Sequence, residues 1–213
     1  MTKKNLKAYL LSLGVDNADE KTEKLWSYTD ELMLFNPSLK LVGSTDRDDI
    51  LLRHILDCAS AYPVFLSETK EGDTIADLGS GAGLPGIVLA VLFPEREFFL
   101  IERMTRRVGF LRSTAAVLKL GNAHIVDKDI SDVREKYSLL TCRAFHPLSD
   151  IAEHASLLSG NAVFYKGTSD NVKRELDTLR LGGWRFEERT VPVTVPGLGE
   201  ERNIVVLHNW EKE

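Results

Sequence analysis

The amino-acid sequence predicts an α/β fold with a mostly parallel sheet of seven strands. Apolar runs typical of strands alternate with helical patterns from Asp73 onward, as expected for a parallel sheet covered on both faces. A glycine-rich run from Asp77 to Gly86 joins the first strand to the helix that follows it. The last two strands have no helix between them, and their link at about 191–202 is rich in Pro and Gly, which predicts an antiparallel hairpin.

The N-terminal third shows no strand pattern and is predicted to be a helical extension over residues 1–70. Its apolar side chains recur at helical spacing, namely Leu6, Leu10, Leu13, Leu25, Tyr28, Leu32 and Phe35. A further helix is expected over 49–66, interrupted at Tyr62-Pro63. We expect residues 71–213 to form the sheet domain.

The elements of the sheet domain follow one another closely along the chain. The expected strands are 74–78, 97–102, 123–126, 138–142, 161–166, 184–190 and 203–209. The expected helices are 84–93, 105–119, a short piece near 131–136, 149–159 and 169–181. Ligands of an open parallel sheet bind at the carboxyl ends of the strands, so the residues that follow each strand are the site candidates.

Composition excludes several classes of protein. Of 213 residues, 43% are hydrophobic and 28% are charged, which is typical of a globular protein. A net charge of -5 argues against a surface that binds nucleic acid throughout, although it allows a local basic patch. Cys58 and Cys142 suit a reducing cytosol, and no His, Cys or Asp cluster suggests a metal. The N-terminus has no long apolar region, so neither a signal peptide nor a membrane span is expected.

The glycine run indicates a ligand site. Gly79, Gly81 and Gly83 allow the backbone to bend sharply and to approach a ligand closely. The carboxylate of Asp77 disfavours a pyrophosphate and suits an adenosine-bearing ligand with an ammonium group and ribose hydroxyls. Glu102 ends the second strand, where a carboxylate can accept hydrogen bonds from both hydroxyls of a ribose.

The same run also matches the pattern G-x-G-x-x-G, which fits a nicotinamide dinucleotide and an oxidoreductase. Three features weigh against this alternative. Asp77 places a negative charge beside the turn, and Pro85 before Gly86 suits the start of a helix better than pyrophosphate packing. The final hairpin is foreign to a dinucleotide fold with six parallel strands.

Five segments resemble the bacterial RsmG family, also called GidB, of class I S-adenosylmethionine-dependent methyltransferases. They are 77–87, 53–57 (Arg-His-Ile-Leu-Asp), 106–111 (Arg-Arg-Val-Gly-Phe-Leu), 143–145 (Arg-Ala-Phe) and 166–167 (Lys-Gly). Departures are Lys40-Leu41-Val42, where the family often has Asn-Leu-Thr, and Cys58, where Ser is usual. The resemblance implies a Rossmann-like fold and a cytoplasmic enzyme. It also implies methylation of a guanine at N7 in 16S rRNA, near the decoding centre of the 30S subunit.

The resemblance also implies cofactor contacts. Together with the strand-end positions, the expected S-adenosylmethionine set is Asp77, Gly79, Gly81, Leu84, Glu102, Arg103, Met104, Ile130, Ser131 and Arg143. Ile130 and Ser131 are expected to hold the adenine between an apolar surface and a backbone donor. Guanine N7 has a lone pair and no proton to lose, so catalysis is expected to rest on positioning rather than on a strong base.

Arg143 and Lys166 are the candidate catalytic residues, in positioning roles. Arg143 would bind the methionine carboxylate or a substrate phosphate, the alternative being a structural ion pair. Lys166 would contact a phosphate or guanine O6, unless it is a solvated lysine. Phe145 would stack on the base or belong to the core. His54, which shares a helix face with Asp57, would line the pocket or form a polar pair.

Arg106 and Arg107 are the candidate RNA contacts, beside Arg103 at the cofactor end of the second crossover. A second basic cluster is interpreted as a solvated helix face and consists of Lys173, Arg174 and Arg180. Two further alternatives stay open. One is a methyltransferase of a small molecule or protein, and the other is a non-catalytic module that binds S-adenosylmethionine.

Overall fold

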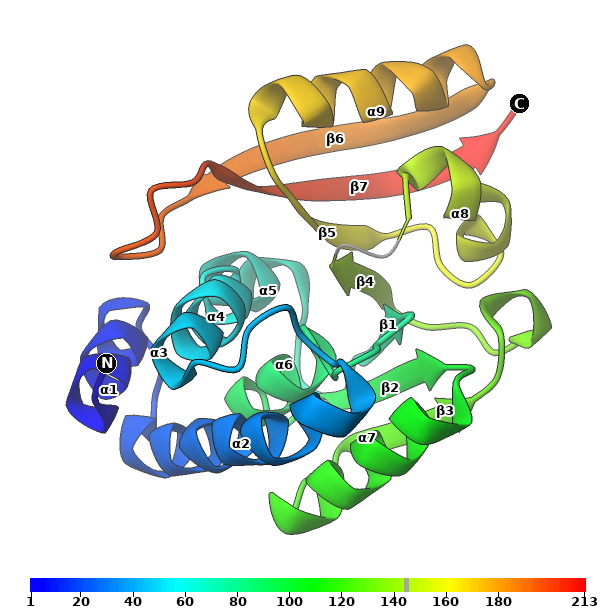
Figure 1. Cartoon of the computed structure of the whole chain (residues 1–213). Helices are drawn as coiled ribbons and strands as arrows, with labels where there is room; N and C mark the ends of the chain where they lie inside the picture. The colour runs from blue at the N-terminus through cyan, green and yellow to red at the C-terminus, as the bar shows by residue number, and fades with distance from the viewer. Residues whose placement is uncertain (144–145) are drawn as a thin grey trace.

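The computed structural model describes residues 1–143 and 146–213 and contains a seven-stranded sheet flanked by helices (Figure 1). The strands lie in the order β3-β2-β1-β4-β5-β7-β6. Their bounds are β1 Thr74–Leu78, β2 Glu97–Glu102, β3 Ala123–Asp127, β4 Leu139–Arg143, β5 Ala162–Lys166, β6 Trp184–Val193 and β7 Arg202–Lys212. Strands β1 to β5 pair in parallel, whereas β7 is antiparallel to β5 and to β6. The predicted parallel sheet with a C-terminal hairpin is therefore confirmed.

Helices cover both faces of the sheet. They are α6 Gly86–Leu92, α7 Thr105–Val117, α8 Leu148–Ser156 and α9 Ser169–Leu181. Successive side chains of a strand point to opposite faces, so Ile75 and Val163 belong to one hydrophobic cluster, whereas their neighbours Ala76 and Phe164 belong to the other. The first cluster packs with α6 and α7, and the second with α8 and α9. This burial on both faces explains why the parallel strands appear in the sequence as nearly continuous apolar runs.

The helical N-terminal segment agrees with the expectation. It consists of α1 Lys3–Ser12, α2 Ala18–Leu39, α3 Arg47–Ile50, a π-helical turn Leu51–Leu56, α4 Asp57–Ala59 and α5 Tyr62–Glu68. Pro63 lies in the first turn of α5, where its missing N–H breaks no hydrogen bond. Leu25, Tyr28 and Ile55 join the same hydrophobic cluster as Ile75 of the sheet. The division into two domains near residue 70 stays a prediction.

The stretch Arg47–Glu68 is long and apolar enough, by length and composition, to cross a membrane. However, 67% of its most apolar window is buried inside the protein. This burial is what a core helix shows, because its apolar side chains already pack against the rest of the chain.

The prediction of a short helix near 131–136 is wrong. The chain forms a single 3-10 turn at Ile130–Asp132, and Val133 is already extended, with φ -76° and ψ 137°. The Asp129 carboxylate accepts hydrogen bonds from the Ser131 backbone N–H at 3.0 Å and from its hydroxyl at 2.9 Å. Such local side-chain bonds stabilise a turn at the expense of a continuing helix.

Candidate active site

A tight glycine loop connects β1 to α6. Gly79, Gly81 and Gly83 have positive φ angles of 67°, 56° and 87°, which L side chains rarely adopt. A Cβ on Gly83 would lie 2.5 Å from Cγ1 of Ile87, so the loop also leaves no room for one. The hydroxyl of Tyr28, on α2, donates a buried hydrogen bond of 2.6 Å to the Ala82 carbonyl. The N-terminal segment thereby fixes the loop from outside the sheet.

Asp77 lies beneath this loop. It is 1% exposed, and its Oδ2 accepts a 3.0 Å hydrogen bond from the Gly86 backbone N–H, at the start of α6. Its Oδ1 is buried without a hydrogen-bond partner among the described residues. Burial raises the pKa of Asp77 to about 7. Asp77 does not line the cavity described next, and its cofactor contact stays a prediction.

A cavity of about 800 Å³ opens above the loop, at the carboxyl ends of β1 to β4. We call it the glycine-loop cavity. Most of the predicted site residues line it, namely His54, Gly79, Gly81, Leu84, Glu102, Arg103, Met104, Arg107, Ile130, Ser131 and Arg143. The link between α2 and α3 covers it with Leu41, Val42 and Gly43. Polar strand ends and an apolar cover give a cavity suited to a ligand with both kinds of surface.

Glu102 connects the glycine loop to the β2–α7 turn. Its Oε2 accepts from the Gly81 backbone N–H at 2.9 Å, and its Oε1 accepts from the Met104 backbone N–H at 2.8 Å. The side chain is almost fully buried yet borders the cavity. Each carboxylate oxygen has a second lone pair, so Glu102 can hold the loop and still accept hydrogen bonds from a ligand.

The sequence predicts a backbone hydrogen-bond donor for the adenine at Ile130 and Ser131. In the structure, the Ser131 backbone N–H already has a partner within the protein. This N–H donates to Asp129, which also accepts a hydrogen bond of 3.0 Å from the exposed Arg103 side chain. These bonds lower the pKa of Asp129, with the Ser131 backbone N–H as the largest cause. Asp129 therefore adds a fixed carboxylate to the β3 side of the cavity, and sequence reasoning missed it as a site residue.

Arg143 lies at the centre of a buried polar network. Its guanidinium contacts Asp57 Oδ2 at 2.9 Å and His54 Nδ1 at 2.9 Å. Arg202 contacts the other oxygen of Asp57 at 3.0 Å. Burial, assisted by the Arg143 charge, lowers the pKa of His54 to about 4, so the imidazole is neutral at pH 7. Arginine only donates hydrogen bonds, so Nδ1 is the acceptor and the single imidazole proton is on Nε2.

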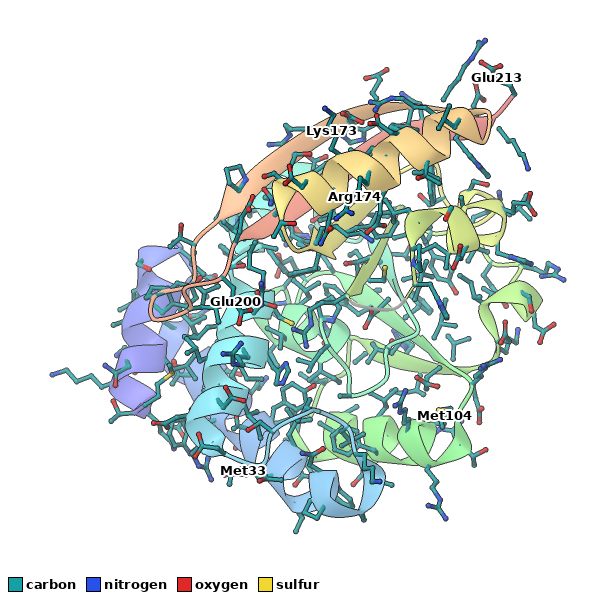
Figure 2. The ribbon with its side chains drawn as sticks, turned by 45° about the horizontal axis from the view of Figure 1, so that its top comes forward. Met33, Met104, Lys173, Arg174, Glu200 and Glu213 are labelled. Carbon is teal, nitrogen blue, oxygen red and sulfur yellow. The ribbon has the colours of Figure 1, made fainter. Side chains whose placement is uncertain are left out.

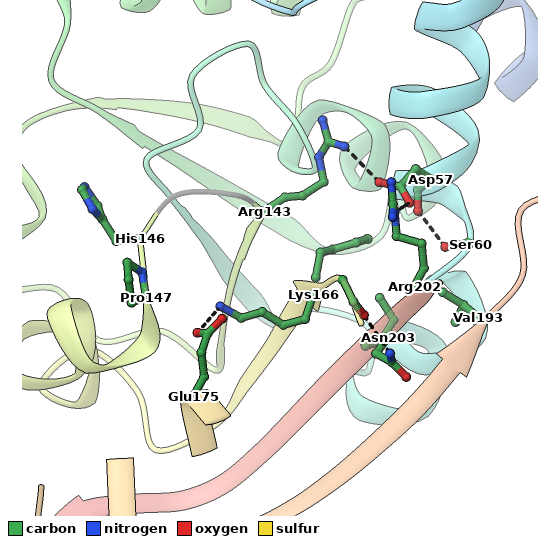
Figure 3. Close-up of a pocket in the computed structure, with 13 residues that line it drawn as sticks. Asp57, Ser60, Arg143, His146, Pro147, Lys166, Glu175, Val193, Arg202 and Asn203 are labelled. Atoms are coloured by element: carbon green, nitrogen blue, oxygen red, sulfur yellow. Dashed lines mark hydrogen bonds and ion pairs between the residues drawn. The ribbon is translucent and has the colours of Figure 1, made fainter. Parts of the chain in front are cut away.

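A second cavity of about 460 Å³, which we call the side cavity, lies over the ends of β5 and β7 (Figure 3). Arg143 and His146 line both cavities, so the two spaces adjoin. Lys166 lines the side cavity, and its ammonium contacts Oε2 of Glu175, on α9, at 2.7 Å. Lys166 therefore lines a different cavity from most of the predicted cofactor residues, and Arg143 lines both cavities.

Several polar residues of the two cavities carry no sequence signal. Glu175 meets Lys166 only because α9 packs back over the sheet, and Arg202 meets Asp57 across 145 residues of chain. Such pairs are set by tertiary structure rather than by spacing. Asn203, next to Arg202 in β7, also lines the side cavity and donates to the Gly167 carbonyl at 2.8 Å.

The remaining candidates lie apart from the cavities or outside the described residues. Arg106 is exposed on α7 but does not line either cavity. Lys173 and Arg174 lie on α9, away from Met104 at the start of α7 (Figure 2). Phe145 lies outside the described residues. Residues 1–143 and 146–213 contain no group of three or more His, Cys, Asp or Glu side chains suited to a metal ion.

The sheet order and the glycine-loop cavity define a class I methyltransferase fold. Magnesium protoporphyrin IX methyltransferase of Synechocystis PCC 6803, solved with bound S-adenosylmethionine, superposes with a TM-score of 0.57 at 15% identity, covering 85% of this chain and 97% of its own. The ribosomal protein L11 methylase of Lactobacillus delbrueckii gives a TM-score of 0.54 at 13% identity, covering 71% and 77%. At these identities the likeness shows the fold alone.

Sequence relatives identify the family. The family described as rRNA small subunit methyltransferase G (GidB) matches residues 21–204. The protein called ribosomal RNA small subunit methyltransferase G in Borrelia hermsii is 33% identical over 206 residues, covering 93% of this chain and 96% of its own. Its namesake in Treponema pallidum (strain Nichols) is 37% identical over 194 residues, covering 86% and 83%. The chain belongs to the rRNA small subunit methyltransferase G family and is a methyltransferase.

Proposed function

We propose that this protein is a cytoplasmic enzyme that transfers a methyl group from S-adenosylmethionine to N7 of a guanine in 16S rRNA, near the decoding centre. The observation that carries the proposal is the glycine-loop cavity, which gathers eleven predicted residues at one edge of the sheet. Family membership supports the acceptor, because the relatives are named for small-subunit rRNA.

The residues of the glycine-loop cavity fit S-adenosylmethionine. Glu102 keeps lone pairs for the ribose hydroxyls while both its oxygens are fixed by backbone N–H groups. Gly81 offers its backbone without a Cβ, and Ile130 offers an apolar surface to the adenine. Bound in this cavity, the cofactor supplies an electrophilic methyl group on a sulfonium.

Methylation of guanine N7 requires little acid–base chemistry from the protein. The N7 lone pair forms the new bond to the methyl carbon as the carbon–sulfur bond breaks, and the electron pair of that bond stays on sulfur. No proton leaves N7, so no strong general base is needed. His54 is neutral at pH 7, so it adds no positive charge to the glycine-loop cavity. The contribution of Arg143 and Lys166 is to position the reactants, an effect that can supply roughly 7–11 kcal/mol.

Cationic side chains beside the glycine-loop cavity suit the RNA backbone. Arg103, Arg106 and Arg107 lie at the end of β2 and the start of α7, and the side chain of Arg103 is 74% exposed. With a net charge of -5, the chain offers this patch rather than a basic surface throughout. Such a footprint favours a folded partner of defined shape, so we propose the 30S subunit as the substrate.

The test is methyl transfer from labelled S-adenosylmethionine to 30S subunits that lack the modification. We expect label in 16S rRNA, with less transfer to naked 16S rRNA and none to ribosomal proteins. Calorimetry on the same preparation establishes that the cofactor binds. Cofactor binding without label in rRNA would overturn the proposed acceptor, and label in the protein fraction would indicate a protein methyltransferase.

A further inference from the structure

Of the predicted cofactor residues, Arg143 alone lines the side cavity, which adjoins the glycine-loop cavity through Arg143 and His146. The side cavity lies over the carboxyl end of β5 and the start of β7. These lie next to the strand ends that line the glycine-loop cavity. A planar group that enters the side cavity would lie beside a methyl donor held in the glycine-loop cavity. Lys166 and Glu175 form an ion pair among the polar side chains that line the side cavity (Figure 3).

The Lys166–Glu175 pair is held in a fixed position. Oε2 of Glu175 accepts from the Lys166 ammonium at 2.7 Å and from the Leu148 backbone N–H, at the start of α8, at 3.0 Å. The side chain of Lys166 is 12% exposed and that of Glu175 is 27% exposed. Strand β5, α8 and α9 thus all contribute to the placement of one ammonium and one carboxylate.

Each partner has hydrogen-bonding capacity left over. A lysine ammonium has three N–H donors, and this one uses a single donor within the described part of the chain. The Oε1 atom of Glu175 accepts no hydrogen bond from a described residue. A partly buried ion pair adds little net stability by itself. The cavity therefore presents a spare donor beside a spare acceptor to whatever enters it.

We propose that Lys166 and Glu175 read the edge of the acceptor base and select guanine, an inference that rests on the proposed function. The Lys166 ammonium donates to O6, and Glu175 Oε1 accepts from the amino group at C2. This edge lies on the six-membered ring, so N7 on the five-membered ring stays free to receive the methyl group. The assignment gives Glu175 a role in base specificity.

The other three bases do not match this pair. Adenine has an amino group at C6, so two hydrogen-bond donors would face each other at the Lys166 ammonium. Adenine also has no amino group at C2 for Glu175 to accept from. Cytosine presents an amino group and an oxygen in the reverse order, and uracil presents oxygens at both positions. A site built to bond one polar edge rejects analogues strongly, because its own buried groups are then left unpaired.

Inosine in place of the target guanosine tests the inference, because it keeps O6 and N7 but lacks the C2 amino group. With reconstituted 30S subunits, wild-type kcat/KM for guanosine should exceed that for inosine at least about tenfold, as one hydrogen bond to a charged group implies. Glu175→Ala should bring the two values to within about twofold. Lys166→Met should lower both values by a similar factor, because both bases carry O6.

Control variants keep this result interpretable. Asp177→Ala changes an exposed acid on the same helix, outside both cavities, and should leave the guanosine-to-inosine ratio unchanged. Glu175→Gln keeps an acceptor for the Leu148 N–H. It should therefore lower the guanosine-to-inosine ratio without the loss of stability that Glu175→Ala could cause. Unchanged affinity for S-adenosylhomocysteine shows that the glycine-loop cavity is intact in each variant.

Two outcomes separate the inference from the proposed function. A wild-type ratio near one, or a ratio that Glu175→Ala leaves unchanged, overturns base reading by this pair while methyl transfer to guanosine persists. Failure of the wild-type protein to methylate guanosine in 30S subunits, by contrast, overturns the proposed function itself.

Discussion

Single carboxylates fix several backbone segments of this protein. Glu102 fixes both the glycine loop and the turn before α7, because each of its oxygens holds one backbone N–H. Glu97, at the opposite end of the same strand, is half exposed and pairs with His124. The two glutamates therefore differ in environment although they belong to one strand.

Replacing Glu102 tests its predicted role in ribose binding. Glu102→Ala should weaken binding of S-adenosylmethionine by at least about 1 kcal/mol, or about fivefold in Kd, because charge-assisted hydrogen bonds are lost. Isothermal titration calorimetry measures the change, with Glu97→Ala as the matched control. An affinity equal to that of the wild type would mean that the ribose is held elsewhere.

Asp77 should give the fold a distinctive dependence on pH. Burial raises its pKa from 3.8 to about 7, so between these values the folded state binds a proton that the unfolded state does not. Stability should therefore fall as the pH rises from about 4 to about 7, since the slope has the sign of the unfolded-minus-folded proton count. Each pKa unit corresponds to about 1.4 kcal/mol, so the loss amounts to a few kcal/mol.

Asp77→Asn isolates this effect, because the amide oxygen can still accept from the Gly86 N–H. Urea unfolding at several pH values should show the variant gaining stability over the wild type as the pH rises, with most of the gain present above pH 7. Parallel pH profiles for the two proteins would show that Asp77 titrates normally in the folded state.

At the scale of elements, the start of α6 depends on close packing against β1. A Cβ on Gly86 would lie 2.6 Å from Oδ2 of Asp77 and 3.0 Å from Cγ of Leu100. Both neighbours are buried, so neither can move away freely. The glycine is therefore required for the helix to approach the strand.

Gly86→Ala should accordingly destabilise the protein by about 1–3 kcal/mol, the range for overpacking a filled core. Gly109→Ala provides the matched control, because Gly109 lies inside α7 and its added Cβ would point into open space. That variant should gain up to about 1 kcal/mol from helix propensity. Thermal unfolding that ranks Gly86→Ala at or above the wild type would contradict the packing described here.

For the molecule as a whole, periodicity and strand order explain which features could be predicted from sequence. The alternation of strands and helices is a local pattern, and in a parallel sheet it places Glu102 and Ile130 at the same edge. The hairpin could be predicted because a Pro- and Gly-rich link leaves no room for a helix. The class of fold and most of one cavity follow from these local signals.

The failures have a common physical cause. The expected helix after β3 is replaced by a turn because the Asp129 side chain bonds to Ser131, a competition that apolar spacing does not show. Glu175 joins the side cavity because α9 packs back over β5, and Arg202 joins it by pairing with Asp57, 145 residues away along the chain. No pattern in one sequence encodes a contact of that kind, so the side cavity needed the structure.

The cavities proposed for the cofactor and for the acceptor are separate but adjoin at Arg143, which lines both. We propose methyl transfer to guanine N7 in 16S rRNA. Reduction with borohydride followed by aniline cleaves RNA at N7-methylguanosine, so this treatment of rRNA from methylated 30S subunits detects the product itself. We predict one new cleavage, at a guanosine near the decoding centre. Labelled rRNA that resists cleavage, or that is cleaved elsewhere, would contradict it.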